Sequence, residues 1–188
     1  MKKSESGITL VELMLVLSVL GVLLINIAPI GFGKSREIKL IDGVMSDIVA
    51  AINMARTAAI FEAKMVTFCR SSDGKNCKGQ WHEGSIIFTD SNADKIINGQ
   101  DRLLYKLDAI AAEGNLSFNS FRNRQYLQMT PRGTTNYQNG NFSFCPSNKN
   151  PALARQIIVS ATGRTRYARD LDGDGIVENS KGQPLHCE

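Results

Sequence analysis

The sequence predicts an α+β fold in which one long N-terminal helix packs on a β-rich globular head. Two observations carry this prediction. Apolar residues run almost without interruption from Ile8 to Ala28, and they then recur at helical spacing to about Ala63. Beyond Ala63, short runs of β-branched and aromatic residues alternate with Gly, Asn and Asp, which is typical of an antiparallel sheet. The expected parts are a short basic segment of residues 1–7, a helix of residues 8–63 and a head of residues 64–188.

The first apolar run is long enough to cross a membrane. About 21 helical residues span about 31 Å, the thickness of the hydrocarbon core of a bilayer. Lys2 and Lys3 precede the run, and the next basic residue is Lys34. Because positive charge stays on the cytoplasmic side, we expect a transmembrane segment at about residues 8–28, with the head exported. Four polar residues interrupt the run: Thr9, Glu12, Ser18 and Asn26.

Glu12 lies one turn inside this apolar helix and needs a partner. An ionised carboxylate in an apolar membrane segment costs several kcal/mol unless it is paired. A free amino group on a neighbouring copy of the helix would be a suitable partner.

The residues around Glu12 resemble the type IV prepilin signal. That signal joins a short basic leader ending in Gly to an apolar run with Glu at its fifth position, as Gly7 and Ile8-Thr9-Leu10-Val11-Glu12 do here. The family usually has Phe where this chain has Ile8. The resemblance implies cleavage between Gly7 and Ile8 by prepilin peptidase, N-methylation of Ile8, and pairing of Glu12 with the amino terminus of the next filament subunit. The alternatives are an uncleaved anchor, or a secretory signal cut near Gly31-Phe32-Gly33.

Composition limits what the head does. The formal net charge is +4, and removing residues 1–7 leaves 20 basic and 17 acidic side chains, or +3. This excess is too small to indicate nucleic-acid binding unless the charges cluster locally. The chain length fits one domain after the anchor.

Four cysteines in an exported domain predict two disulfides. The sequence permits three pairings, of which we favour one with a short loop near a strand end and a second that fixes the C-terminal tail. Zinc is disfavoured because no Cys-x-x-Cys occurs and His82 and His186 lack ligand spacing. The favoured pairs are Cys69 with Cys77 and Cys145 with Cys187.

Pro29, Gly31 and Gly33 follow the membrane run and permit a kink or local melting. Beyond them an apolar stripe at alternating steps of three and four residues predicts an amphipathic helix that packs on the sheet. A dimeric coiled coil is the alternative, although the repeat is brief and ends in Ala. The stripe consists of Ile38, Ile41, Met45, Ile48, Ile52, Ala55 and Ala59.

Eight strands are expected in the head, with no helix after Ala63. They cover Met65 to Cys69, Ser85 to Thr89, Arg102 to Leu107, Asn115 to Phe118, Tyr126 to Thr130, Phe142 to Cys145, Arg155 to Ala161 and Arg164 to Ala168.

Several head segments resemble the minor pilins and pseudopilins of the GspH, FimT and FimU family. The resemblance rests on a tryptophan-glycine strand with an Asp-rich loop and on the closing strands. It implies a minor pilin of a type IV pilus, whose partners are other pilins, prepilin peptidase and an inner-membrane assembly platform. A type II secretion pseudopilin is the alternative. The matching segments are Trp81 to Asp94, Pro131-Arg132-Gly133, Gly140 to Cys145 and Ile157 to Arg166.

Arg164 and Arg166 are candidate DNA contacts. They follow Gly163 and, in an extended strand, project from one face, where two guanidinium groups suit successive phosphates. Arg169 and Arg155 are possible helpers. In the FimT branch a Gly-Arg-x-Arg pattern is associated with DNA capture, so the resemblance implies this role. Alternatively the arginines pair with carboxylates, and the acidic run from Asp170 to Asp174 would offset a phosphate-binding patch.

Two Asp-rich loops imitate the front of a calcium loop, but we expect Asx-stabilised turns and no metal site. The loop that starts at Asp170 has Lys181 at its twelfth place, where a bidentate carboxylate is needed, and the loop that starts at Asp90 has Lys95 where Gly belongs. Calcium stays open for both. No nucleophile motif, phosphate loop or paired carboxylates appear, so we expect neither an enzyme nor a cofactor.

Overall fold

The computed structural model describes Gly7 and residues 9–187, without the side chains of residues 24–34. The chain forms two units, Met1–Lys39 and Leu40–Glu188, and helix α1 (Leu10–Glu62) contributes residues to both. The helix continues through Pro29, Gly31 and Gly33, so the local melting allowed for there does not occur. A proline removes one backbone hydrogen bond, and the flanking turns keep theirs.

The second part of α1 is the core helix of the head. The predicted apolar stripe is buried from Ile41 to Ala59, with Met45 and Ile52 fully covered, whereas its first member, Ile38, is only partly buried. The helix ends at Glu62, and Ala63 has a positive φ of 52° that stops it. The predicted amphipathic helix and its end are therefore confirmed.

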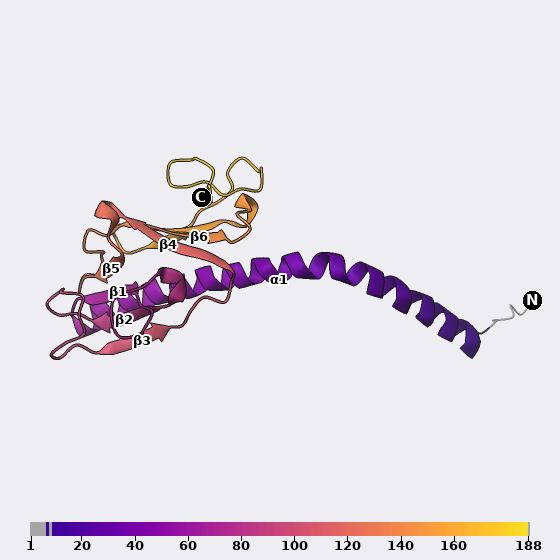
Figure 1. Ribbon diagram of the computed structural model, residues 1–188, viewed down its shortest axis with the longest axis horizontal. Helices are drawn as coiled ribbons and strands as arrows, with labels where there is room; N and C mark the ends of the chain where they lie inside the picture. The colour runs from indigo at the N-terminus through magenta and orange to yellow at the C-terminus, as the bar shows by residue number, and fades with distance from the viewer. Residues whose placement is uncertain (1–6, 8, 188) are drawn as a thin grey trace, which may run out of the picture. The chain divides into compact units, whose positions relative to one another are not determined.

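The strands form two antiparallel four-stranded sheets (Figure 1). All eight predicted strands are present, with ends that differ by at most two residues, but they divide between two sheets where one was expected. The first sheet has the order β3 (Leu103–Leu107), β2 (Ser85–Thr89), β1 (Val66–Arg70) and β5 (Tyr126–Met129). The second has the order β4 (Gly114–Ser120), β6 (Gly140–Pro146), β7 (Arg155–Val159) and β8 (Thr165–Tyr167).

An aromatic cluster joins the two sheets. Phe142 on β6 stacks on Phe118 of β4 with ring centroids 4.3 Å apart, and it meets Trp81 edge-on at 4.9 Å. Phe68 on β1 contacts both Trp81 and Phe142, at 5.1 and 5.9 Å. Trp81 lies in a short 3₁₀ helix, η1 (Trp81–Glu83), and not in the strand expected from the resemblance. Gly84, with φ of 136°, ends this turn before β2 begins.

Two disulfides close the head, and they are the favoured pairs. Cys69 on β1 bonds to Cys77, and Cys145 on β6 bonds to Cys187. The second fixes the C-terminal segment, which has no helix among its described residues and only an isolated bridge between Glu178 and Pro184. Figure 1 shows this segment, drawn in yellow, on the same side as β4 and β6.

Candidate functional site

Helix α1 begins with a side-chain cap. The Glu12 amide donates to Oγ1 of Thr9 at 3.3 Å, and the Leu13 amide donates to the Thr9 carbonyl oxygen at 3.1 Å. Thr9 is therefore the N-cap and Glu12 the third helical residue, in the spacing of a capping box. A carboxylate in the first turn also suits the positive end of the helix dipole. Glu12 thus has a local role in addition to any intermolecular one.

The first part of α1 exposes its apolar side chains on every face. Leu10 and Val11 are both 70% exposed, and the large apolar side chains from Leu13 to Leu23 are about half exposed or more. Leu10–Leu23 is an apolar stretch that the predicted span at residues 8–28 includes. Ser35–Glu62 is also long and apolar enough to cross a membrane, but its stripe is buried in the head, so we regard it as a core helix.

The predicted cleavage site is only partly described. Gly7 is exposed, whereas Ile8 lies outside the described residues. Cleavage and N-methylation therefore stay predictions.

The hairpin between β7 and β8 has the predicted glycine turn. Gly163 has a φ of 73°, and its amide donates to the Ser160 carbonyl oxygen at 2.9 Å. A Cβ added to Gly163 would lie 2.5 Å from the carbonyl oxygen of Gly133, which accepts a hydrogen bond from Nε of Arg56 at 2.9 Å. Glycine is required at position 163 both by its backbone conformation and by this close approach.

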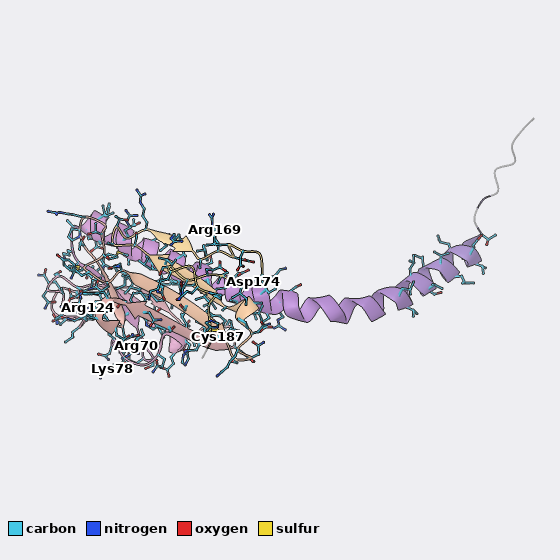
Figure 2. All side chains as sticks on the ribbon, turned by 90° about the horizontal axis from the view of Figure 1, so that it is seen from above. Arg70, Lys78, Arg124, Arg169, Asp174 and Cys187 are labelled. Carbon is cyan, nitrogen blue, oxygen red and sulfur yellow. A yellow bond between two sulfur atoms is a disulfide. The ribbon has the colours of Figure 1, made fainter. Side chains whose placement is uncertain are left out.

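The predicted DNA-contact arginines are exposed on this hairpin. Arg164 precedes β8 and Arg166 lies within it. Arg169 follows β8 and is labelled in Figure 2. In the described part of the chain, none of the three has a carboxylate within ion-pair distance. Arg155 cannot help them, because its Nε donates to Asp42 on α1 at 3.3 Å. The guanidinium groups of Arg164 and Arg166 are therefore available to a ligand, but Arg155 does not assist them.

The first Asp-rich loop is held by hydrogen bonds, as the turn interpretation predicts. Asp90 is fully buried, and its Oδ2 accepts from Oγ1 of Thr67 at 2.5 Å and from Nε2 of Gln128 at 3.0 Å. Asp94 accepts from the Asn98 side chain and from a loop amide, which holds the pKa of Asp94 below its ordinary value. Among the described residues of this loop, no three carboxylates lie close enough together to hold a metal ion.

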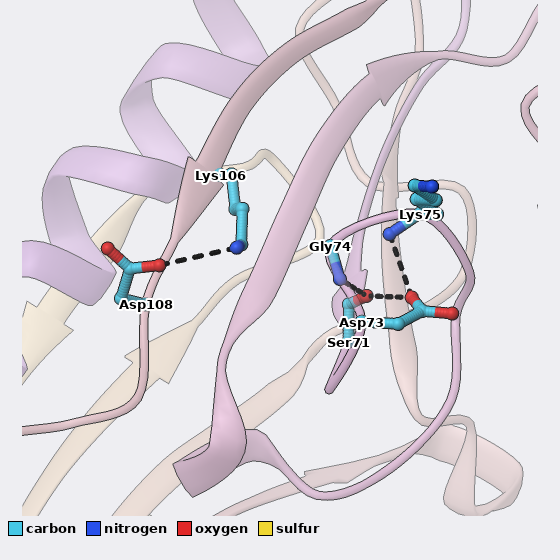
Figure 3. Close-up of polar contacts among 6 residues, drawn as sticks. All are labelled: Ser71, Asp73, Gly74, Lys75, Lys106 and Asp108. Atoms are coloured by element: carbon cyan, nitrogen blue, oxygen red, sulfur yellow. Dashed lines mark hydrogen bonds and ion pairs between the residues drawn. The ribbon is translucent and has the colours of Figure 1, made fainter.

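A similar loop closes between Cys69 and Cys77, and Figure 3 shows Asp73 within it. Asp73 accepts from the side chain of Asn76 and from the amides of Asn76 and Lys75, all at 2.8 Å. These donors hold the pKa of Asp73 well below its usual range. Beside the loop, Nζ of Lys106 on β3 lies 3.4 Å from Oδ1 of Asp108. The absence of a side chain at Gly74 leaves room for the Lys106 side chain.

The second Asp-rich loop brings together four carboxylates. One oxygen from each of Asp170, Asp172, Asp174 and Glu178 lies within 4.8 Å of the others. The first three were recognised in the sequence, but Glu178 was missed. It occupies the ninth place counted from Asp170, which is a ligand position in calcium loops and could have identified it.

The described part of the head has no catalytic arrangement of the kinds considered above. His82 is half-buried on η1, and its Nδ1 lies 3.2 Å from the side-chain oxygen of Asn115. A groove of about 1050 Å³ beside β4 and β6 is rich in Asn, Ser and Gln side chains, with His186 among its lining residues. Neither histidine is paired with a nucleophile.

Two family models match the chain. Residues 45–163 match Type II transport protein GspH, and residues 2–25 match the prokaryotic N-terminal methylation motif. The chain belongs to the GspH family. Arg164, Arg166, Arg169 and the Asp170 loop lie beyond the part that the GspH model matches. No curated protein sequence matches the chain.

Solved structures show the same fold as this GspH-family chain. The type IV minor pilin FimU of Pseudomonas aeruginosa is 20% identical, with a TM-score of 0.56 over 84% of this chain and 99% of FimU. A second crystal form of FimU gives 19% identity and a TM-score of 0.53 over 78% of this chain and 99% of FimU. The minor pseudopilin EpsH from the Type 2 Secretion System of Vibrio cholerae is 11% identical, with a TM-score of 0.47 over 65% of this chain and 90% of EpsH. The FimU structures thus confirm the α+β fold of a type IV pilin.

Proposed function

We propose that this GspH-family chain is a minor pilin, a structural subunit that is inserted into a type IV pilus through the first part of α1. Prepilin peptidase cleaves it between Gly7 and Ile8, and Ile8 is then methylated. It is held in the inner membrane with its head in the periplasm until an assembly platform moves it into the filament. The observation that carries this proposal is the exposed apolar surface of Leu10–Leu23, with Glu12 in the first turn of the helix.

The exposed surface needs an apolar environment in every direction. A helix that is apolar all round is stable when lipid or other apolar helices surround it. Lipid provides an apolar environment for Leu10 and Val11, but it provides no positive charge to pair with the carboxylate of Glu12. A filament of packed helices supplies both the apolar neighbours and a free amino terminus for Glu12. The methylation motif over residues 2–25 supports such a processed terminus.

Replacement of Glu12 separates its two roles. Gln keeps the hydrogen-bonding capacity of the third position of a capping box but removes the charge. We expect both Glu12→Gln and Glu12→Ala to be excluded from filaments, while Trp81 fluorescence shows a folded head. The matched control is Glu113→Gln, which removes an exposed charge from the head and should assemble normally. Normal assembly of Glu12→Gln would contradict the charge pairing.

N-terminal sequencing tests the processing step. The chain isolated from membranes should begin at methylated Ile8. A chain that begins at Met1 in cells with active peptidase would refute the filament role and leave a tethered domain. Identification of the membrane proteins that co-purify with the chain distinguishes a pilus from a type II secretion filament.

DNA binding is the second candidate, favoured by the exposed and unpaired guanidinium groups of Arg164 and Arg166. If these contact phosphates, Arg164→Gln with Arg166→Gln should weaken binding to duplex DNA and reduce the slope of log K against log salt by about 2. The matched control is Lys75→Gln with Lys78→Gln. It also removes two positive charges, but at positions between β1 and η1, far in the sequence from the hairpin. Equal slopes in both double variants would remove the DNA proposal.

A further inference from the structure

The Asp170 loop has its carboxylates fixed in place by backbone amides. Oδ1 of Asp170 accepts from the Gly173 amide at 2.6 Å, and Oδ2 accepts from the Gly175 amide at 2.8 Å. Oδ1 of Asp174 accepts from the Ile176 amide at 2.7 Å, and Figure 2 shows Asp174 on this segment. Oδ1 of Asp172 accepts from the Asp174 amide at 3.2 Å, so all three exposed aspartates are already ordered within the loop.

Glu178 is different because it is buried. Its exposed fraction is 6%, and Oε2 accepts from the Leu171 amide at 2.7 Å. Oε1 is buried and has no hydrogen-bond partner. A buried carboxylate oxygen without a donor is costly, and a positive charge beside it would remove that cost.

Side chains do not supply that charge. Among the described Lys, Arg and His side chains, none forms an ion pair with Glu178 or with the three aspartates. Arg169 is adjacent in sequence, but its contact with Glu178 is a backbone one, in which the Glu178 amide donates to the Arg169 carbonyl oxygen at 3.0 Å. Four carboxylates within 4.8 Å therefore lack a countercharge from the protein.

We propose that Asp170, Asp172, Asp174 and Glu178 bind one divalent cation, and that the cation is Ca²⁺. Hard oxygen ligands select Ca²⁺ or Mg²⁺ over zinc, which prefers nitrogen and sulfur. The acids occupy places one, three, five and nine, and Gly175 occupies place six, the order of ligands and glycine in a calcium loop. Mg²⁺ instead demands a near-ideal octahedron at short distance and usually retains several waters.

The site would fix the C-terminal segment at a second point. Cys187 already ties the end of the segment to β6, whereas residues 169–178 are held mainly by loop hydrogen bonds. A cation shared by Asp170 and Glu178 would join the two ends of this loop. This proposal does not depend on the assembly role of Glu12.

Calorimetric titration of the full chain in detergent, after treatment with a chelator, tests the proposal. We expect one Ca²⁺ per chain with a Kd on the order of 10⁻⁴ to 10⁻³ M, as in extracellular calcium modules. Glu178→Gln should weaken binding at least about 10-fold. The matched control is Asp94→Asn in the other Asp-rich loop, which should bind as the unaltered chain does.

Three results would overturn the proposal. The first is no binding at a Ca²⁺ concentration about 10-fold above the expected Kd range. The second is a Kd for Glu178→Gln equal to that of the unaltered chain, and the third is Mg²⁺ binding as tight as Ca²⁺ binding. Because Glu178 is buried, Trp81 fluorescence is used to check that its variant folds. Asp172→Asn, which changes an exposed ligand, provides the same test with the same expected loss if Glu178→Gln does not fold.

Discussion

Truncation of Phe142 tests the join between the two sheets. Phe142 is fully buried and contacts the rings of Phe68, Trp81 and Phe118. A buried aromatic side chain removes about 150–250 Å² from water, worth about 4–6 kcal/mol at about 25 cal/mol per Å². Since Ala retains a methyl group, we expect Phe142→Ala to lower the free energy of unfolding by about 3–5 kcal/mol. That is a large share of the stability of a domain of this size.

Urea denaturation followed by tryptophan fluorescence measures this loss. Trp81 is the one tryptophan of the chain, and its ring lies 4.9 Å from that of Phe142, so the signal comes from the cluster itself. The matched control is Phe121→Ala at a side chain that is 57% exposed, where we expect a loss below about 1 kcal/mol. A loss below about 2 kcal/mol for Phe142→Ala would refute the close packing of the two sheets.

Three further predictions concern the loops. Gly163→Ala should cost at least about 2 kcal/mol in urea denaturation, because it adds a close backbone contact to the positive φ, whereas Gly182→Ala, with the same φ but open space, should cost about 1 kcal/mol. Hydrogen bonds from Asn76 and neighbouring amides lower the pKa of Asp73, so the contribution of Asp73 to stability is present above about pH 4 and is lost as the pH falls. The difference in unfolding free energy between the unaltered chain and Asp73→Asn should therefore shrink as the pH is lowered below about 4. Mass mapping of unreduced peptides should recover the two disulfides of the head and no cross-pair.

Local sequence patterns predicted the elements of the fold well. Ser85–Thr89 is a strand at the expected residues, and α1 ends one residue before the expected limit. Both follow from features within a few residues, namely β-branched composition and an apolar stripe. The division into two sheets did not follow, because β5 pairs with β1 across about 60 residues, and pairing of that kind depends on tertiary packing rather than on local pattern.

The candidate sites divide in the same way. The turn at Gly163 and the exposure of Arg164 follow from a glycine and an alternating strand, so the sequence predicts them. The burial of Glu178 depends on how the C-terminal segment folds back, and no local pattern encodes it. For Trp81 the local pattern was misleading. Its residue type is common in strands, but it lies in a 3₁₀ turn, where its ring contacts Phe68 of the first sheet and Phe142 of the second.

The two parts of α1 differ in what they require of their surroundings. From Ile41 to Ala59 a single stripe is buried, and charged residues such as Asp47 lie on the exposed side, so the head alone satisfies this part. In Leu10–Leu23 no face is polar, and large apolar side chains are exposed along the whole stretch. A surrounding of lipid accounts for such a helix until Glu12 is considered. Because Glu12 adds a requirement for a positive charge inside that apolar surface, we infer that packed copies of processed helices are the environment for which this segment is suited.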